Sequence, residues 1–472
     1  MTSSRRRVPT GPLTDALADL RAELEVPTAF PPEVEQAAEA AAVRGPRHDR
    51  VDATDLPLVT IDPPGSRDLD QAVHVAAEGR GFVVSYAIAD VAAFVDQGDP
   101  VDEEAWVRGV SRYSPDRVTP LHPRALSEGA ASLLPDEDRP AVLWTIRLGA
   151  DGDIDDVAVR RATVRSRAQL TYAEAQHAID LGTDPMLVRL SRVGRLRAER
   201  EWVRGGVSLA LPDQEVHRTD DGTFDLRYRA PRPVEEWNAQ ISLLTGIAAG
   251  TMMADAGIGV LRTLPAPDPD AVQALRQRAW ALGLPWPREI PYAAFVRTLD
   301  PHEPVEAAMV SLAAVGLRGA GYVAFDGETP DEHRHEALAS AYAHVTAPLR
   351  RLVDRYGSEI ALSLHAGVRP PDWVLQRLDE LPKAMARARG RAGALDRAVL
   401  DLVEAHVLAP QVGRTFAATV VRTSDRGTDV QLRQPAVTAR LVGVELPLGT
   451  EVQVRLDAVD PAGRTVVFVP AS

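Results

Sequence analysis

The stretch 58-LVTIDPPGSRDLDQAVHV-75 places three carboxylates and a glutamine around a single turn. An apolar run typical of a buried strand ends in Asp62, a Pro-Pro-Gly turn follows, and Asp68, Asp70 and Gln71 come next. Aspartate is common in turns, so the plain interpretation is a solvated loop. The turn, however, brings the later carboxylates back toward Asp62, and like charges held together raise one another's pKa unless a cation neutralises them. The spacing alone leaves a simple turn and a Mg²⁺ site both open.

The composition is that of a globular protein with several domains. The chain has 472 residues, of which 45% are hydrophobic and 25% charged, and this length predicts two or three domains. It contains no cysteine, which excludes disulfides and thiolates, so a metal must bind oxygen or imidazole, as Mg²⁺ and Mn²⁺ do. No apolar run is long enough to cross a bilayer, and no apolar segment follows Arg5–Arg7 to make a secretory signal. We therefore expect a cytoplasmic protein without a membrane partner.

Residues 1–50 have a helical pattern. Apolar positions recur at helical spacing in 12-PLTDALADLRAEL-24 and again in 31-PPEVEQAAEAAAV-43. Two short helices joined by a turn are consistent with a helix-turn-helix and hence with DNA binding, but many domains pair helices in this way. Both interpretations of this segment stay open.

The sequence pattern of residues 51–411 predicts one large mixed α/β body. β-branched runs such as 81-GFVVSYAIADVAAFV-95 and 153-DIDDVAVRRATVRS-166 indicate strands, and long amphipathic segments after about residue 169 indicate helices. Residues 412–472 show about five short strands separated by turn signals, which is typical of a five-stranded OB-fold barrel. The net charge of −14 argues mildly against non-specific nucleic-acid binding, yet the chain from Arg414 onward has seven arginines against six acids. We expect that end to contact a polyanion.

Five segments, taken together, resemble one family. The stretch 60-TIDPPGSRDLDQAVHV-75 is similar to the signature of the RNB catalytic domain of the ribonuclease II and ribonuclease R family. The segments that resemble further family motifs, in the family's order, are 86-YAIADVAAFV-95, 112-RYSPDRVTPLHPRALSEGAASLLPDEDRPAV-142, 234-VEEWNAQISLLTG-246 and 342-YAHVTAPLRRLVD-354. The resemblance implies an RNB body over residues 51–411 and an OB-fold RNA-binding domain over residues 412–472. Residues 1–50 depart from the family pattern, because bacterial members usually begin with two cold-shock domains and this segment is expected to be helical.

The activity implied by this resemblance is metal-dependent hydrolysis of single-stranded RNA from its 3′ end, with release of nucleoside 5′-monophosphates. By similarity, Asp62, Asp68 and Asp70 would hold or orient Mg²⁺, or Mn²⁺, directly or through waters, and Asp70 matches the aspartate on which family catalysis most depends. Gln71 replaces an aspartate that is a metal ligand in many members, so it offers a carbonyl oxygen but no charge. We expect a working monomeric enzyme with modest metal affinity.

Arg350 matches the family arginine that approaches the scissile phosphate, although a structural salt bridge is its alternative. The resemblance assigns contacts with RNA to Tyr113, Tyr172, Glu235, Glu236, Arg351 and Asp396. From the residues alone, Tyr113 is equally consistent with a core tyrosine, the two glutamates with caps of the helix that begins there, and Arg351 with a surface residue. A non-catalytic RNA-binding regulator on the same fold is the competing hypothesis, and Gln71 is its best support.

Overall fold

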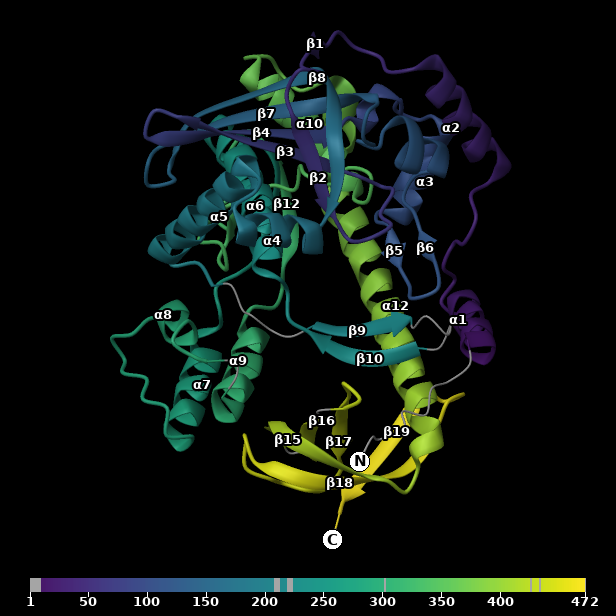
Figure 1. Cartoon of the computed structure of the whole chain (residues 1–472), viewed down its shortest axis with the longest axis vertical. Coiled ribbons are helices and arrows are strands. Elements are labelled where there is room, and N and C mark those ends of the chain that lie inside the picture. The colour runs from purple at the N-terminus through teal and green to yellow at the C-terminus, as the bar shows by residue number, and fades with distance from the viewer. Residues whose placement is uncertain are drawn as a thin grey trace.

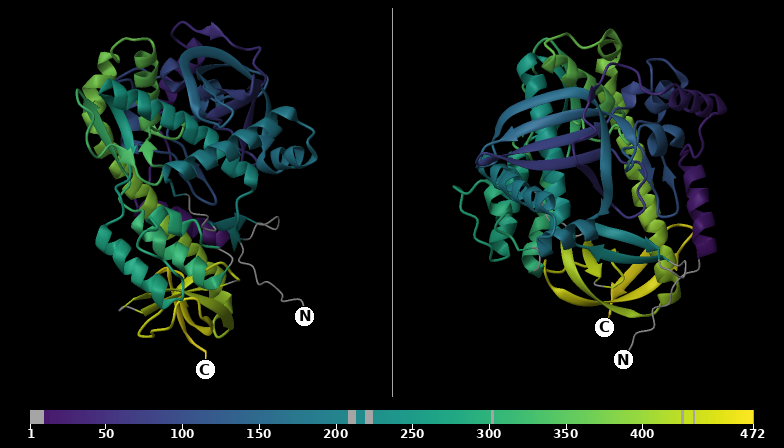
Figure 2. Two further views of the ribbon diagram at one scale, coloured as in Figure 1. Left: turned by 90° about the vertical axis from the view of Figure 1, so that its left-hand side faces the viewer. Right: turned by 45° about the horizontal axis from the view of Figure 1, so that its top comes forward.

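The computed structural model describes residues 10–207, 213–218, 224–300, 303–424, 427–432 and 434–471. Figure 1 shows a large body built on a twisted sheet, a small barrel at the opposite end, and the long helix α12 (Leu381–Leu408) running between them. The two further views in Figure 2 show the same separation of body and barrel. The predicted combination of a mixed α/β body with a C-terminal five-stranded barrel is confirmed.

The body is built around one six-stranded sheet whose order is β1-β8-β2-β3-β4-β7. The long strand β8 also pairs with β7, so the sheet closes on itself between these strands. Strand β4 is buried on both faces over most of its length, which explains why its sequence is almost continuously apolar. The bounds are β1 (Val51–Asp52), β2 (Leu58–Asp62), β3 (Gln71–Glu78), β4 (Gly81–Ala89), β7 (Asp138–Leu148) and β8 (Ile154–Thr171).

Helices cover this sheet, and their apolar side chains pack against it to form the core of the body. Helix α5 packs against α6 and β3, and α10 packs against α6 and β8. Thr171 and Glu174 form a capping box that starts α4 directly after β8, and Asp184 caps the start of α5. The bounds are α3 (Pro100–Arg108), α4 (Tyr172–Leu181), α5 (Pro185–Arg204), α6 (Pro233–Ala256), α10 (Leu352–His365) and α11 (Asp372–Arg377).

Smaller elements lie at the sides of the body and between body and barrel. The hairpin of β9 and β10, which the sequence did not predict, buries Phe224 and Leu226 in the apolar cluster of the barrel. The bounds are β5 (Arg112–Tyr113), β6 (Val118–Thr119), β9 (Asp213–Arg218), β10 (Phe224–Arg229), β11 (Ile258–Thr263), α7 (Pro269–Ala281), α8 (Tyr292–Val296), α9 (Pro304–Gly316), β12 (Gly321–Asp326), β13 (Arg334–His335) and β14 (Ser340–Ala341).

The C-terminal barrel has the strand order β17-β16-β15-β18-β19, with antiparallel neighbours throughout. Its core alternates along the strands, as the short β-branched runs predict, and includes Val420, Val454 and Phe468. The bounds are β15 (Thr415–Ser424), β16 (Gly427–Leu432), β17 (Thr438–Leu441), β18 (Glu451–Asp460) and β19 (Thr465–Pro470).

The two N-terminal helices form as predicted, but they do not make a helix-turn-helix. Helix α1 (Thr10–Glu23) buries its leucines against α12 and the barrel, whereas α2 (Pro32–Arg44) buries its apolar face against α3 and the sheet. Figure 1 shows them well apart along one side of the molecule. A helix-turn-helix needs its two helices packed on each other with one free to enter a groove, so the described part of residues 1–50 does not form this motif. DNA binding by this segment stays a prediction. None of the described helices is both long and apolar enough to span a membrane.

Candidate active site

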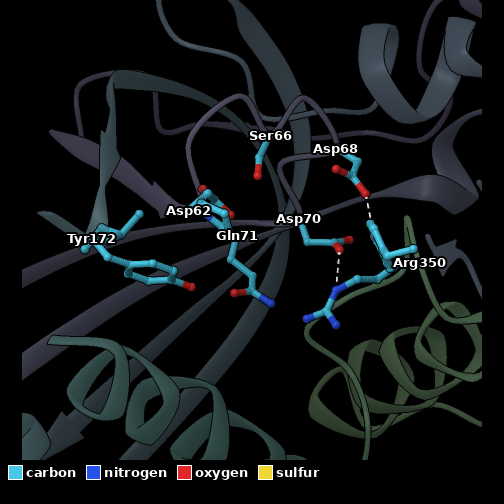
Figure 3. Close-up of a pocket in the computed structure, with 10 residues that line it drawn as sticks. Asp62, Ser66, Asp68, Asp70, Gln71, Tyr172 and Arg350 are labelled. Carbon is cyan, nitrogen blue, oxygen red and sulfur yellow. Dashed lines mark hydrogen bonds and ion pairs between the residues drawn. The ribbon is translucent and has the colours of Figure 1, made fainter. Parts of the chain in front are cut away.

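One pocket gathers seven of the residues that the sequence singled out. It lies where β2 ends and β3 begins, beside the loop that precedes α10, and Figure 3 shows the labelled side chains arranged around it. Its lining consists of Ile61, Asp62, Pro63, Ser66, Asp68, Asp70, Gln71, Tyr113, Tyr172 and Arg350. Of these, Ser66 belongs to the quoted turn but no pattern marked it as functional.

Asp62 ends β2 with a carboxylate oxygen that lacks a partner. Its Oδ2 is buried and makes no hydrogen bond with any residue in the described part of the chain. Burial raises the pKa of Asp62 to about 6. The nearby Thr60 hydroxyl opposes this rise, although it is too poorly aligned to count as a hydrogen-bond partner, and the charge of Asp68 adds to the rise. Because a buried carboxylate oxygen without a partner is costly, this atom fits a site that a cation or a proton completes.

Asp70 is buried and is oriented by the loop that precedes α10. The Leu349 backbone N–H donates to Oδ1 at 2.7 Å, and Arg350 Nε lies 3.3 Å from Oδ2, as the dashed line in Figure 3 marks. Burial raises the pKa of Asp70 to about 7, and the positive charge of Arg350 opposes this rise. The orientation of this carboxylate is therefore determined by the protein itself.

Gln71, the first residue of β3, is bound to the protein at both ends of its amide. Its Nε2 donates to the Thr346 carbonyl at 2.6 Å, and its Oε1 accepts from the Tyr86 hydroxyl at 3.0 Å. That hydroxyl also lies 2.8 Å from Ser242 Oγ. The expected ligand atom of Gln71 thus already has a hydrogen bond, which sequence reasoning missed. Tyr86 and Ser242 both lie in segments that resemble family motifs, so their positions in the sequence offered a signal, but nothing in the sequence linked them to Gln71.

Tyr113 lies at the pocket and not in the core. Its hydroxyl donates to Asp68 Oδ2 at 2.7 Å, and the residue is 51% exposed, so the core alternative is wrong. Burial of the hydroxyl raises its pKa and the Asp68 charge adds to this, so it stays a neutral donor. Tyr172, at the start of α4, lines the same pocket.

The Arg350 side chain is 43% exposed and extends from Asp70 into the pocket. Its neighbour Arg351 is placed differently. Arg351 Nε and Nη2 donate to the two oxygens of Asp354 at 2.8 and 2.7 Å, and the Asp354 side chain is fully buried. Arg351 is therefore not a free surface residue, because its planar fork is occupied by a buried carboxylate. A contact of Arg351 with RNA stays a prediction.

The two glutamates of α6 lie outside the lining of the pocket and differ from each other. Glu235 Oε1 accepts from the Arg232 backbone N–H at 2.9 Å, and Arg229 Nη1 donates to both of its carboxylate oxygens. Glu235 is therefore the helix cap that was kept as an alternative, whereas Glu236 is exposed. Asp396 is exposed on α12 and is likewise absent from the lining.

The three aspartates share the pocket without forming a compact ligand set. Within the described ranges, no group of three or more His, Asp or Glu side chains could hold a metal ion by itself. Asp68 is engaged by Tyr113 and Asp70 by the Leu349 N–H and Arg350, whereas Asp62 Oδ2 is a buried oxygen without a partner in the described part of the chain. The arrangement fits an ion that takes only part of its shell from the protein, as Mg²⁺ commonly does.

Comparison with known families agrees with this geometry. Residues 50–360 match the RNB domain, and residues 414–471 match the RNase II-type exonuclease C-terminal S1 domain. The first match covers well over half of the chain, so the chain belongs to the RNB-domain family.

Relatives and solved structures extend this result. Ribonuclease R of Escherichia coli K12 is 27% identical over 513 residues, which cover 94% of this chain and 60% of that protein. The chain thus spans about three fifths of the length of this relative. The apo form of Mycoplasma genitalium RNase R superposes with a TM-score of 0.87 at 19% identity, covering 97% of this chain and 78% of that one. Yeast Ssd1, described as a pseudonuclease, superposes with a TM-score of 0.69 at 17% identity, covering 88% and 54%. At these identities the structures show a shared fold.

Proposed function

We propose that this chain hydrolyses single-stranded RNA from the 3′ end with the help of a divalent cation, releasing nucleoside 5′-monophosphates. The observation that carries the proposal is the buried, unpartnered Oδ2 of Asp62 in the same pocket as Asp70 and Arg350. Membership in the RNB-domain family supports the same reaction. The Mycoplasma genitalium RNase R has also been solved in complex with ribose-methylated single-stranded RNA.

Mg²⁺, with Mn²⁺ as a substitute, is the proposed cofactor. Asp62, Asp68 and Asp70 would hold it, with waters and a phosphate oxygen of the RNA completing its shell. When bound, the ion supplies an activated water and neutralises charge on the phosphoryl group. Gln71 would contribute less to this ion than an aspartate, because its amide carries no charge and its oxygen already accepts from Tyr86.

The side chains around the ion would position the RNA. Arg350 would offset the negative charge that develops on the scissile phosphate. Tyr113 and Tyr172 present aromatic rings at the pocket, and bases stack on such rings without sequence preference. Of the two glutamates, Glu236 is the one we propose near the 3′-terminal nucleotide, since Glu235 caps α6 and binds Arg229.

A second candidate is a non-catalytic RNA-binding regulator on the same fold. For both candidates we propose a monomer that works in the cytoplasm. Two observations favour it: Gln71 stands where many members have an aspartate, and the fold is shared with a pseudonuclease. The presence of Asp62, Asp70 and Arg350 in one pocket favours hydrolysis instead.

Labelled single-stranded RNA incubated with Mg²⁺ separates the two candidates. We expect monophosphates from the native chain, and a loss of about a hundredfold or more in Asp70→Asn, whose amide oxygen can still accept from the Leu349 N–H. Asp326→Asn is the matched control, because Asp326 pairs with Arg369 at an exposed position. A native chain that binds RNA yet releases no monophosphate supports the regulator, and undiminished release by Asp70→Asn would contradict the proposed role of that aspartate.

A further inference from the structure

The hairpin that carries Tyr113 has little internal support. Strands β5 and β6 contain two residues each, joined by a turn in which Ser114 and Arg117 exchange backbone hydrogen bonds of 2.9 and 3.2 Å. A two-stranded ribbon of this size is not stable by itself in water. The position of Tyr113, and with it the 2.7 Å hydrogen bond to Asp68, must therefore be determined by what packs on the hairpin.

Part of that support comes from the loop before α10, whose Arg350 carbonyl accepts from the Ser111 backbone N–H at 3.0 Å, and part comes from helix α1 and the segment after it. Arg21 Nη1 and Nη2 donate to the two carboxylate oxygens of Asp116, in the turn of the hairpin, at 2.8 Å each. The two side chains are only 6% and 10% exposed, so this bidentate pair is shielded from water and salt. In the same turn, Arg117 Nη2 donates to the Thr28 carbonyl at 2.6 Å.

The residues that flank the hairpin are held by the same segment. Arg108, at the end of α3, donates to the carbonyls of Pro27 and Ala29 and to that of Pro120, which directly follows β6. Its guanidinium also stacks on the Phe30 ring, 3.7 Å from the centroid. Residues 27–30 are thus bound to Arg108, which lies shortly before the hairpin and also binds the residue that follows it.

Helix α1 is in turn anchored at the barrel end of the molecule. Its leucines lie in one apolar cluster with α12 and the barrel strands, and Glu23 accepts two hydrogen bonds from Arg464, at 2.8 and 2.9 Å. Figures 1 and 2 show α1 beside α12, on the side of the molecule where β5 and β6 lie. The helix therefore connects the barrel with the hairpin that bears Tyr113.

We propose that Arg21 is a positioning residue for the active site: through Asp116 it fixes the hairpin, and so the Tyr113 ring and the Asp68 carboxylate. This inference rests on the proposed exonuclease function, in which a base of the RNA stacks on the Tyr113 ring at the pocket. A Tyr113 ring in a fixed position determines the shortest RNA that can still bind in the pocket for another cleavage. Loosening the hairpin should therefore change the length of the final product as well as the rate.

The test compares Arg21→Ala with Arg464→Ala, which removes the other ion pair of the same helix but no contact with the hairpin. Final products of a labelled single-stranded RNA are resolved by length, and amide hydrogen exchange is followed in residues 112–119. For Arg21→Ala we expect final products longer by at least about one nucleotide and exchange at least about tenfold faster in the hairpin. Arg464→Ala should match the native chain in both measurements, because the buried leucines of α1 still hold the helix on α12 and the barrel when this exposed ion pair is removed.

A second variant and a readout that does not depend on activity complete the test. If Arg21→Ala does not fold, Arg21→Lys keeps the charge but loses the bidentate geometry, and the same changes are expected in weaker form. Native product length together with native exchange in 112–119 would overturn the proposal, as would a uniform loss of rate with unchanged products. If the native chain releases no monophosphates, the proposed function fails. In that case the rate of amide exchange in residues 112–119 of Arg21→Ala still shows whether α1 fixes the hairpin.

Discussion

Replacing Gln71 by aspartate tests what the glutamine does in the acidic pocket. Aspartate is one methylene shorter, so Gln71→Asp loses the 2.6 Å hydrogen bond to the Thr346 carbonyl and the 3.0 Å bond from the Tyr86 hydroxyl. Tyr86 keeps Ser242 as a partner, so only the Thr346 carbonyl is left unpaired. Such a loss costs about 1–3 kcal/mol of unfolding free energy. We expect the variant to fold, with a denaturation midpoint lowered accordingly.

The gain in Gln71→Asp is a carboxylate beside the buried Asp70 in the pocket. Attraction between a divalent cation and a new negative charge is strong where the effective dielectric constant is low, although desolvation cancels most of it. We expect the Mg²⁺ concentration at half-maximal monophosphate release to fall about ten- to a hundredfold, equivalent to about 1.4–2.7 kcal/mol. A titration of the initial rate with Mg²⁺, and equilibrium binding of Mn²⁺ without RNA, measure this change.

Gln71→Leu is the matched control for Gln71→Asp. It removes both hydrogen bonds of the amide without adding a charge, so it should lose a similar amount of stability and gain no metal affinity. Unchanged or weaker metal binding in Gln71→Asp, with the fold intact, would refute the reasoning that the missing charge limits the site.

Two further predictions concern stability. Arg355 Nη1 lies 2.6 Å from Asp102 Oδ1 with both side chains buried, so Arg355→Ala should cost about 3–5 kcal/mol in denaturant titrations. Arg369→Ala, which breaks an exposed pair, should cost less than about 1 kcal/mol, and equal losses would contradict this. Burial raises the pKa of Glu404 from 4.5 to about 7, while Gln214 Nε2 donates to its Oε1. The folded state thus binds an extra proton, so stability should fall by up to about 3 kcal/mol as the pH rises from 4.5 through 7. Glu404→Gln should reduce this fall between pH 5 and pH 8, and an unchanged pH dependence would exclude Glu404 as its cause.

Much of the fold followed from local patterns in the chain. The β-branched runs at 81–95 and 153–166 predicted β4 and β8, and the five short runs after residue 412 predicted the barrel. These predictions succeed because side-chain alternation and turn formation depend on residues that are close together in the sequence. The hairpin of β9 and β10 was missed, since its short polar strands depend on the barrel for their burial.

The sequence predicted which residues form the candidate site, whereas the structure showed which contacts those residues make. Asp62, Asp68, Asp70 and Arg350 do meet in one pocket. The partners that define their chemistry, however, come from remote parts of the chain: Gln71 binds a carbonyl 275 residues away, and Asp70 an N–H 279 residues away. Arg351 and Glu235 look as functional as their neighbours in sequence, yet each is engaged by a charged side chain close by.

By itself, the sequence determined most of the strands and helices, the carboxylate turn and the family, because each depends on short-range order that a linear pattern records. Only the tertiary structure decided that a buried oxygen of Asp62 has no partner among the described residues, that the amide of Gln71 is occupied, and that α1 packs on the barrel and the Tyr113 hairpin instead of on α2. The physical reason is that hydrogen bonds and burial depend on distance in space, and folding brings together atoms whose separation along the chain carries no sign of their contact.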